Sequence, residues 1–338
     1  MTAPLSCIIG VSGQRLKKSE SVFLRDANPW GVILFGRNVK NPDQLRHLTR
    51  DIRDSMGRNT LIFIDQEGGR VQRMRAPHWR AFPSGEAYAR IYRRDRIDGR
   101  RACFLGHRLI ADDLRAVGIT ADCAPVLDLP QPGADPIISD RALGTTVEDI
   151  VYLAHAAMAG LMSGGVAPVV KHIPGHGRAT VDSHKALPKI DADRATLETS
   201  DFLPFRKLND APMAMTAHAV YTHNSRSPVT ISRKPLTELI RAAIGFDGLL
   251  MTDDLDMKAL TGDLTRKTER ALRAGCDIAL QCSGRLAESV KVAKGARHLS
   301  GRGLERAQIA ENCTGHVTAF DREAAEAEFN LLMKTAST

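Results

Sequence analysis

The stretch GGVAPVVKHIPGHG, residues 164–177, contains the unit from which the fold is predicted. Two glycines follow an amphipathic segment of helix length, a five-residue apolar run follows the glycines, and charged residues begin where that run ends. Glycine is common at the end of a helix, because the terminating residue there takes a left-handed backbone conformation. Helix, strand and polar loop in this order are the elements of an α/β protein.

The same unit recurs along the whole chain. Apolar runs of strand length alternate with amphipathic segments of helix length, such as Gln44–Met56, Val147–Met162, Leu236–Ile244 and Arg285–Ala296. The runs predicted as strands are Cys7–Val11, Gly31–Phe35, Leu61–Ile64, Ile119–Leu127, Val166–Val170, Met213–Ala217, Leu249–Thr252 and Cys276–Gln281. Strands that alternate with helices predict a parallel sheet.

These eight units predict a single domain with the α/β fold of a (β/α)8 TIM-type barrel. Neither a low-complexity linker nor a change in composition divides the chain, so we expect the domain to span residues 1–338. From about residue 303 the sequence predicts one or two closing helices. An arrangement of two α/β halves is the alternative.

The composition disfavours several classes of protein. The chain has 338 residues and is 43% hydrophobic, which suffices for a large core. Its net charge is +8, but arginines are dispersed and aromatic residues make up only 5%, so we expect no nucleic-acid partner. Six scattered cysteines without a CxxC pair favour reduced thiols over disulfides or a zinc site. The sequence shows neither a membrane-span pattern nor a signal peptide, so we expect a cytoplasmic protein.

Charged residues are predicted to gather at one end of this barrel. The carboxyl ends of the strands form the functional face of a TIM barrel. The polar residues that follow the apolar runs are Asp65 and Arg73, Arg141, Lys171 and His172, His218, and Asp253 with Asp254. Because all of them would lie at the same face, they predict an active site there.

Each of these residues also has a structural explanation. Arginine or lysine at a strand end is often a surface or salt-bridge residue, which applies to Arg73, Arg141 and Lys171. Aspartate at a junction between strand and helix is often an N-cap. His107 and His155 lie inside helix patterns and are predicted to be structural.

The loop over residues 171–188, KHIPGHGRATVDSHKALP, combines the most unusual residues. Metal ligation by His172, His176, Asp182 and His184 is one alternative, but proline and glycine prevent a shared helical face, and we expect no metal. A phosphate loop is disfavoured, because the GxxxxGK[ST] pattern is missing. The glycines predict a mobile loop that carries the pair Asp182 and His184, which is suited to proton transfer.

Taken together, the motifs resemble those of a known enzyme family. They are DQEGGRVQR (65–73), DRALG (140–144), the loop at 171–188, AMTAHAVY (214–221) and GFDGLLMTDDLDMKAL (245–260). In this order they resemble the single-domain β-N-acetylhexosaminidases of glycoside hydrolase family 3, the cytoplasmic β-N-acetylglucosaminidases of peptidoglycan recycling. The length of the chain agrees with that type.

The resemblance implies a role for eight residues. The residues that would hold the N-acetylglucosamine ring in the −1 subsite are Asp65, Arg73, Arg141, Lys171 and His172. Asp253 would be the catalytic nucleophile, and Asp182 with His184 would form the acid/base dyad. Thr252 and Ile173 stand where the family usually has serine and phenylalanine, and both keep the character of the usual side chain.

The predicted function is that of a retaining exo-β-N-acetylglucosaminidase without metal or cofactor. Its partner would be a small-molecule sugar, a muropeptide disaccharide such as N-acetylglucosaminyl-1,6-anhydro-N-acetylmuramic acid, and we expect a monomer. A neutral His184 would not repel phosphate as a carboxylate would, so a β-N-acetylglucosaminide phosphorylase is an alternative. A non-catalytic sugar-binding barrel and a metal-dependent hydrolase are the others.

Overall fold

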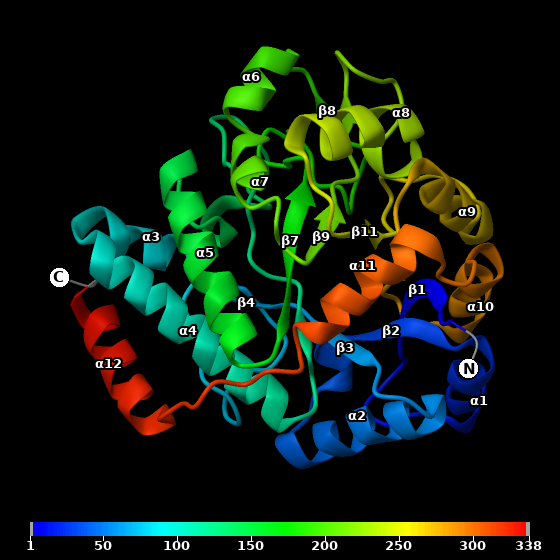
Figure 1. The fold of residues 1–338 in the computed structure, drawn as a ribbon, viewed down its shortest axis with the longest axis horizontal. Coiled ribbons are helices and arrows are strands. Elements are labelled where there is room, and N and C mark those ends of the chain that lie inside the picture. Colours follow the sequence, from blue (N-terminus) through cyan, green and yellow to red (C-terminus); the bar gives the residue numbers. More distant parts are fainter. Residues whose placement is uncertain (1–2, 336–338) are drawn as a thin grey trace.

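The computed structural model describes residues 3–335, which form a closed barrel of eight parallel strands (Figure 1). Its strands are β1 (Leu5–Gly10), β2 (Pro29–Leu34), β3 (Leu61–Ile64), β6 (Ala121–Asp122), β7 (Ala167–Ile173), β9 (Met213–Thr216), β11 (Leu249–Asp254) and β12 (Ile278–Gln281). Each strand pairs in parallel with the next, and β12 pairs with β1 to close the ring. The prediction of an α/β TIM-type barrel is confirmed. Residues 1, 2 and 336–338 of the predicted domain lie outside the described residues.

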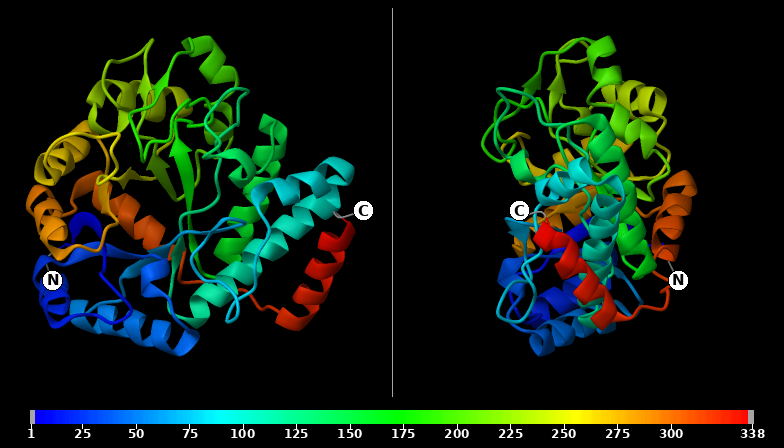
Figure 2. Two further views of the ribbon diagram at one scale, coloured as in Figure 1. Left: turned by 180° about the vertical axis from the view of Figure 1, so that it is seen from behind. Right: turned by 90° about the vertical axis from the view of Figure 1, so that its left-hand side faces the viewer.

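Helices connect the strands and cover the outside of the barrel (Figure 2). They are α1 (Lys18–Ala27), α2 (Pro42–Met56), α3 (Gly85–Arg94), α4 (Arg96–Ala116), α5 (Val147–Ser163), α6 (Arg194–Thr199), α7 (Leu203–Lys207), α8 (Arg233–Pro235), α9 (Leu264–Ala274) and α10 (Leu286–Gly295). Shorter or irregular turns are the 3-10 helices η1 (Gly36–Asn38), η2 (Ser139–Arg141) and η3 (Val229–Ile231), and the π-helix η4 (Leu236–Ile244). None of the helices in residues 3–335 has the length and apolar character needed to cross a membrane.

Two small sheets lie outside the barrel. Strands β4 (Gln66–Gly68) and β5 (Val71–Gln72) form an antiparallel hairpin directly after β3. Strands β8 (Lys189–Ile190) and β10 (Val220–Tyr221) pair in parallel and connect the segments that follow β7 and β9. Both sheets therefore belong to segments that leave the carboxyl ends of barrel strands.

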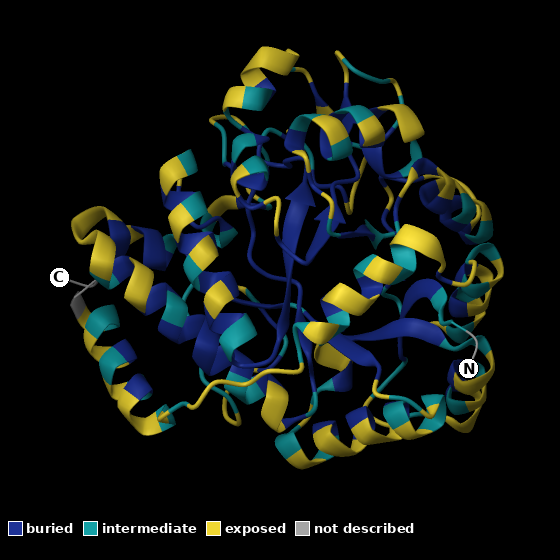
Figure 3. Cartoon of the chain, in the orientation of Figure 1, coloured by how far each residue is buried: buried dark blue, intermediate teal, exposed yellow. Residues whose placement is uncertain are grey.

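The core has an inner and an outer layer. Along β3, Phe63 packs inside the barrel with Ile8 and Met251, while Ile62 points to the layer between strands and helices. This alternation follows from the period of two in a strand. Figure 3 shows the consequence, since the barrel strands are almost entirely buried and the surrounding helices are buried mainly on one side.

Two helices occupy the C-terminal segment for which the sequence predicts closing helices. In α11 (Gly301–Asn312), the small residues Ala307 and Ala310 pack against the inner layer of the barrel. The indole N–H of Trp30, at the start of β2, donates to Glu311 at 2.7 Å, which places α11 at the amino end of the barrel. The last helix, α12 (Arg322–Thr335), packs on α4 (Figure 1).

Two local features differ from the prediction, and a third refines it. The run Ile119–Leu127 yields only the short strand β6, although backbone hydrogen bonds from Val169 to Ala124 and from Leu127 to Lys171 keep the rest of the run beside β7. The helix predicted at Leu236–Ile244 has π-type rather than α-type hydrogen bonding. After α5 the left-handed residue is Gly165, with φ of +70°, whereas Gly164 has φ of −90°.

Candidate active site

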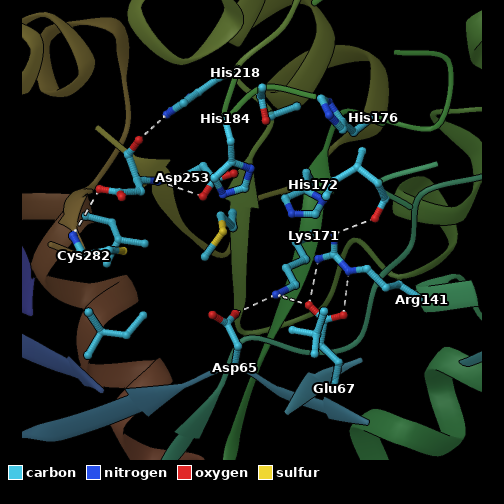
Figure 4. A pocket seen from close by; sticks show the side chains of 18 of the residues that line it. Asp65, Glu67, Arg141, Lys171, His172, His176, His184, His218, Asp253 and Cys282 are labelled. Carbon is cyan, nitrogen blue, oxygen red and sulfur yellow. Dashed lines mark hydrogen bonds and ion pairs between the residues drawn. The ribbon is translucent and has the colours of Figure 1, made fainter. Parts of the chain in front are cut away.

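A cavity of about 180 Å³ opens at the carboxyl ends of the barrel strands (Figure 4). The structure places at this cavity all of the predicted −1 subsite residues, namely Asp65, Arg73, Arg141, Lys171 and His172, together with His184 and Asp253. Asp182 stands behind His184 and bonds to it. The predicted site residues therefore come from segments far apart in the sequence and meet at one face.

Lys171, at the end of β7, is the centre of a buried ion-pair network. Its ammonium group lies 2.9 Å from a carboxylate oxygen of Asp65 and 2.6 Å from one of Glu67. The second oxygen of Asp65 accepts from Arg73 at 2.9 Å. Arg141 binds both oxygens of Glu67, at 2.8 and 2.9 Å, in the two-pronged geometry that favours this pair. Each carboxylate is thus shared by two cations, and Figure 4 shows Lys171 between Asp65 and Glu67.

The network holds all of these groups in their charged forms. Burial raises the pKa of Asp65, but Lys171 and Arg73 outweigh it and keep the pKa well below its usual value. In the same way Lys171 and Arg141 hold the pKa of Glu67 at about 2 against the effect of burial. Burial lowers the pKa of Lys171, and the two carboxylates more than reverse this and raise it. The buried charges are therefore compensated.

Glu67 is a site residue that the sequence prediction missed. It lies on β4, one residue before Gly68, which has φ of +97°. A Cβ on Gly68 would lie 2.2 Å from the carbonyl oxygen of Pro83, so only glycine permits the hairpin to pack here. The glycines of the DQEGGR motif thus place Glu67 over the barrel.

Asp128 is the second residue that was missed, and it is fully buried. Its Oδ2 lies 2.6 Å from Nδ1 of His172, and its Oδ1 accepts the backbone N–H groups of His172 and His176 at 3.2 and 2.6 Å. Burial raises the pKa of Asp128, and His172 is the first of the groups that outweigh it and lower the pKa. An acidic residue within an apolar run, as in CAPVLDL, is the signal that could have identified it.

The segment before the dyad, whose glycines led to the prediction of a mobile loop, is packed against the barrel in this structure. A Cβ on Gly177 would lie 1.9 Å from the backbone oxygen of Leu129. The hydroxyl of Tyr221 donates to the backbone oxygen of Gly175 at 2.6 Å. Close packing therefore requires glycine at position 177, whether or not the loop moves.

Asp182 and His184 form the predicted pair. Asp182 Oδ1 lies 2.9 Å from Nδ1 of His184 and also accepts its backbone N–H at 2.8 Å. Burial raises the pKa of Asp182, but these two hydrogen bonds outweigh it and lower the pKa. An ionised Asp182 makes Nδ1 the donor and leaves Nε2 of His184 free. The side chain of His184 is 66% exposed, at the mouth of the cavity.

Asp253 and Asp254, at the end of β11, have opposite environments. Burial raises the pKa of Asp253, but His172, His218 and the backbone N–H of Asp254 outweigh burial and bring the pKa below its usual value. Asp253 is therefore ionised. Burial raises the pKa of Asp254 to about 7. Asp254 accepts the backbone N–H of Cys282 at 3.1 Å and so links β11 to β12. Neither carboxylate forms an ion pair or a helix cap within residues 3–335.

The side chains of His172, His176, Asp182 and His184, which the sequence offered as alternative metal ligands, do not point to a common centre. Throughout the part of the chain that the structure describes, no three His, Cys, Asp or Glu residues are arranged to hold a metal ion. His172 bonds to Asp128 and His184 bonds to Asp182, so these rings are already oriented by separate carboxylates.

Comparisons with known proteins agree with this geometry. Residues 6–315 match the family model described as glycosyl hydrolase family 3 N terminal domain. A beta-hexosaminidase of Alkalilimnicola ehrlichii is 40% identical over 280 residues, which cover 82% of this chain and 80% of that protein. A beta-hexosaminidase of Bordetella pertussis is 35% identical over 291 residues, which cover 85% of this chain and 82% of that protein. The structure of NagZ from Neisseria gonorrhoeae with N-trifluoroacetyl-D-glucosamine matches with a TM-score of 0.85 and 30% sequence identity. The match covers 99% of this chain and 98% of the NagZ chain.

The depressed pKa of Glu67 generates a prediction about stability in acid. A carboxyl whose pKa falls from 4.5 to about 2 on folding stabilises the protein above the unfolded pKa, and this contribution is lost as the pH falls through that interval. Glu67→Gln removes it and leaves Lys171 and Arg141 less compensated. We therefore expect the melting temperature of the variant to lie below that of the wild type at pH 7, with a difference that shrinks toward pH 3.

Circular dichroism melts of the two proteins between pH 7 and pH 3 measure this difference. Glu323→Gln, which changes an exposed carboxylate in the first turn of α12, is the control and should follow the wild type at every pH. A difference between Glu67→Gln and wild type that stays constant across the range would contradict the assignment of Glu67 to the network.

Proposed function

The chain belongs to glycosyl hydrolase family 3 and is a β-N-acetylhexosaminidase, and we propose that it releases N-acetylglucosamine from muropeptides through a covalent glycosyl-aspartate intermediate. The observation that carries the proposal is the state of Asp253. It is an ionised carboxylate without a cation partner among the described residues, and it lies at the cavity with a His–Asp pair (Figure 4).

Asp253 is better suited to attack the anomeric carbon than its neighbour. A nucleophile must be ionised at working pH, and the environment lowers the pKa of Asp253 but raises that of Asp254 to about 7. Asp254 is also engaged with the backbone N–H groups of Asp256 and Cys282. We therefore assign the attack to Asp253 and a positioning role to Asp254.

His184 would donate the proton to the leaving oxygen and later remove one from water. Retaining glycosidases normally use a second carboxyl for this step. Here the imidazole replaces it, and the ionised Asp182 fixes its tautomer and stabilises the imidazolium form, as carboxylates do in other His–Asp pairs. The free Nε2 is the atom that would exchange the proton.

The ion-pair network around Lys171 would hold the sugar in the −1 subsite. Charged hydrogen-bonding groups that are fixed by each other offer hydroxyl groups a preformed set of donors and acceptors, which lowers the entropic cost of binding. We assign this role to Asp65, Arg73, Arg141, Lys171 and His172. Glu67, which bonds to both Lys171 and Arg141, would orient them rather than the sugar.

The rim of the cavity favours an anionic leaving group. Phe35 lines the cavity, and the guanidinium carbons of Arg37 and Arg73 lie 5.0 and 5.3 Å from its ring centroid. Arg70 lines the same cavity. An apolar ring with cations around it suits a sugar that carries a carboxylate, such as the lactyl group of 1,6-anhydro-N-acetylmuramic acid. This composition supports muropeptides as the substrate class.

The remaining features of the proposal follow from this substrate. We assign the protein to the cytoplasm and to peptidoglycan recycling, where such disaccharides would be degraded. We also propose that the active form is a monomer. The assigned steps need a carboxylate and an imidazole, so we propose that no metal or cofactor takes part.

Product analysis on the disaccharide N-acetylglucosaminyl-1,6-anhydro-N-acetylmuramic acid tests the proposed function. We expect free N-acetylglucosamine as the product, with equal rates in buffer and in excess EDTA. N-acetylglucosamine 1-phosphate as the main product in phosphate buffer would reassign the reaction to phosphorolysis. Loss of activity in EDTA would reject the metal-free reaction, and calorimetric binding without turnover would identify a sugar-binding protein instead.

The assignment of His184 predicts a dependence on the leaving group. A nitrophenolate can depart without a proton, whereas a sugar hydroxyl cannot, and general acid catalysis contributes about 10²–10⁴-fold. His184→Ala should therefore lose about that much in kcat/KM on the disaccharide and much less on the nitrophenyl glycoside. Asp182→Ala should show a weaker form of the same pattern, since it removes only the orienting group.

The chain offers a matched control on its surface. His223 pairs with Asp191 at 3.1 Å, but it is 55% exposed and does not line the cavity. His223→Ala should leave both rates unchanged. Equal losses on both substrates in His184→Ala, or the leaving-group pattern in His176→Ala, would show that the proton donor has been misplaced.

A further inference from the structure

His176 lies at the cavity, but none of the steps above uses its side chain. The residue is only 4% exposed, and its ring stands beside that of His172 with 5.8 Å between the centroids (Figure 4). Within residues 3–335, neither Nδ1 nor Nε2 of His176 has a hydrogen-bond partner. Native proteins rarely bury a polar group without a partner, so an unpaired ring at a ligand cavity calls for an explanation.

The backbone around His176 is firmly placed. Its N–H donates to the buried carboxylate of Asp128 at 2.6 Å. On one side Gly175 accepts from the hydroxyl of Tyr221, and on the other Gly177 packs directly on the backbone of Leu129. The position of the ring is therefore set by the fold, as is required of a group that must meet a ligand with a fixed geometry.

The ring of His176 is neutral at physiological pH. Burial lowers its pKa to about 4 and outweighs the opposing effect of Asp128. A neutral imidazole has one N–H donor and one acceptor nitrogen. It differs in this respect from Lys171 and Arg141, which can only donate.

The position of His176 indicates which part of the sugar it meets. His176 lines the same cavity as Asp253 and Arg141, and its ring stands beside that of His172, so the ring borders the space that the nucleophile and the sugar-binding network also border. Arg141 donates to Glu67 and to the carbonyl oxygen of Ile137, and as a cation it has no acceptor to offer an amide N–H. The carbon next to the anomeric carbon carries the acetamido group, which is uncharged and contains one donor and one acceptor.

We propose that His176 is the specificity-determining residue that hydrogen-bonds the 2-acetamido group of the sugar in the −1 subsite. This inference rests on the proposed role of Asp253, which fixes where the anomeric carbon lies. The ring would select N-acetylhexosaminides over glycosides with a hydroxyl at the same carbon.

Kinetics of His176→Phe on a set of nitrophenyl β-glycosides test the contact. The substitution keeps an aromatic ring of similar width and removes both nitrogens. The substrates are the N-acetylglucosaminide, its 6-deoxy analogue and the glucoside with a 2-hydroxyl. Loss of one uncharged hydrogen bond corresponds to about three- to tenfold in kcat/KM, and we expect this loss on both acetamido substrates but not on the glucoside.

The relative losses of kcat/KM on the three substrates distinguish a contact with the acetamido group from other roles of His176. His155→Phe, a change of the same kind on the exposed face of α5, should leave all three rates unchanged. Equal loss on all three substrates would show that His176 is only structural. If the penalty for removing the 6-hydroxyl disappears in His176→Phe, the contact lies at that hydroxyl and the proposal is wrong. Absence of wild-type activity on every N-acetylhexosaminide would instead contradict the proposed function.

A spectroscopic measurement on the wild type remains decisive if His176→Phe does not fold. In protein with ¹⁵N-labelled histidine, the imidazole signals of His176 can be assigned by their absence in His176→Asn. Saturation with N-acetylglucosamine should shift one of them, because a new hydrogen bond forms, and saturation with glucose should not. Signals that stay unchanged with N-acetylglucosamine would overturn the proposal.

Discussion

The ammonium group of Lys171, buried between Asp65 and Glu67, is the interaction on which the site depends. Its partners come from β3 and from the β4–β5 hairpin, and Arg141 joins from the loop after β6. Loss of one partner would leave a buried charge uncompensated, which costs about 3–5 kcal/mol in comparable pairs. This network therefore fixes the relative positions of three barrel segments as well as the groups that would hold the sugar.

The same network explains why one carboxylate remains available for chemistry. Asp65 and Glu67 are neutralised by cations, and Asp128 is bonded to His172. Asp253 is ionised without an ion pair among the described residues, because nearby imidazoles and a backbone N–H stabilise its charge. The site thus separates carboxylates that bind from the carboxylate that reacts.

The barrel was predictable from the sequence, because its strands begin as short apolar runs, as the run Val166–Val170, which overlaps β7, illustrates. The residues at the strand ends, such as Lys171 and Asp253, were predictable for the same reason. Glu67 and Asp128 were missed, since their partners lie 74 and 44 residues away and no spacing rule encodes that, although the apolar run around Asp128 marks it as a buried acid. The role of Gly177 was also hidden, because close approach to Leu129 is a property of the folded chain.

The central claim, that Asp253 is the group that reacts, is tested most directly by trapping it. A slow 5-fluoro N-acetylglucosaminyl fluoride should leave one sugar on the wild-type protein, and fragmentation of the labelled peptide should place it on Asp253. Asp254→Asn should still be labelled, whereas Asp253→Asn should not. A sugar found on Asp254, or labelling that survives in Asp253→Asn, would contradict the account.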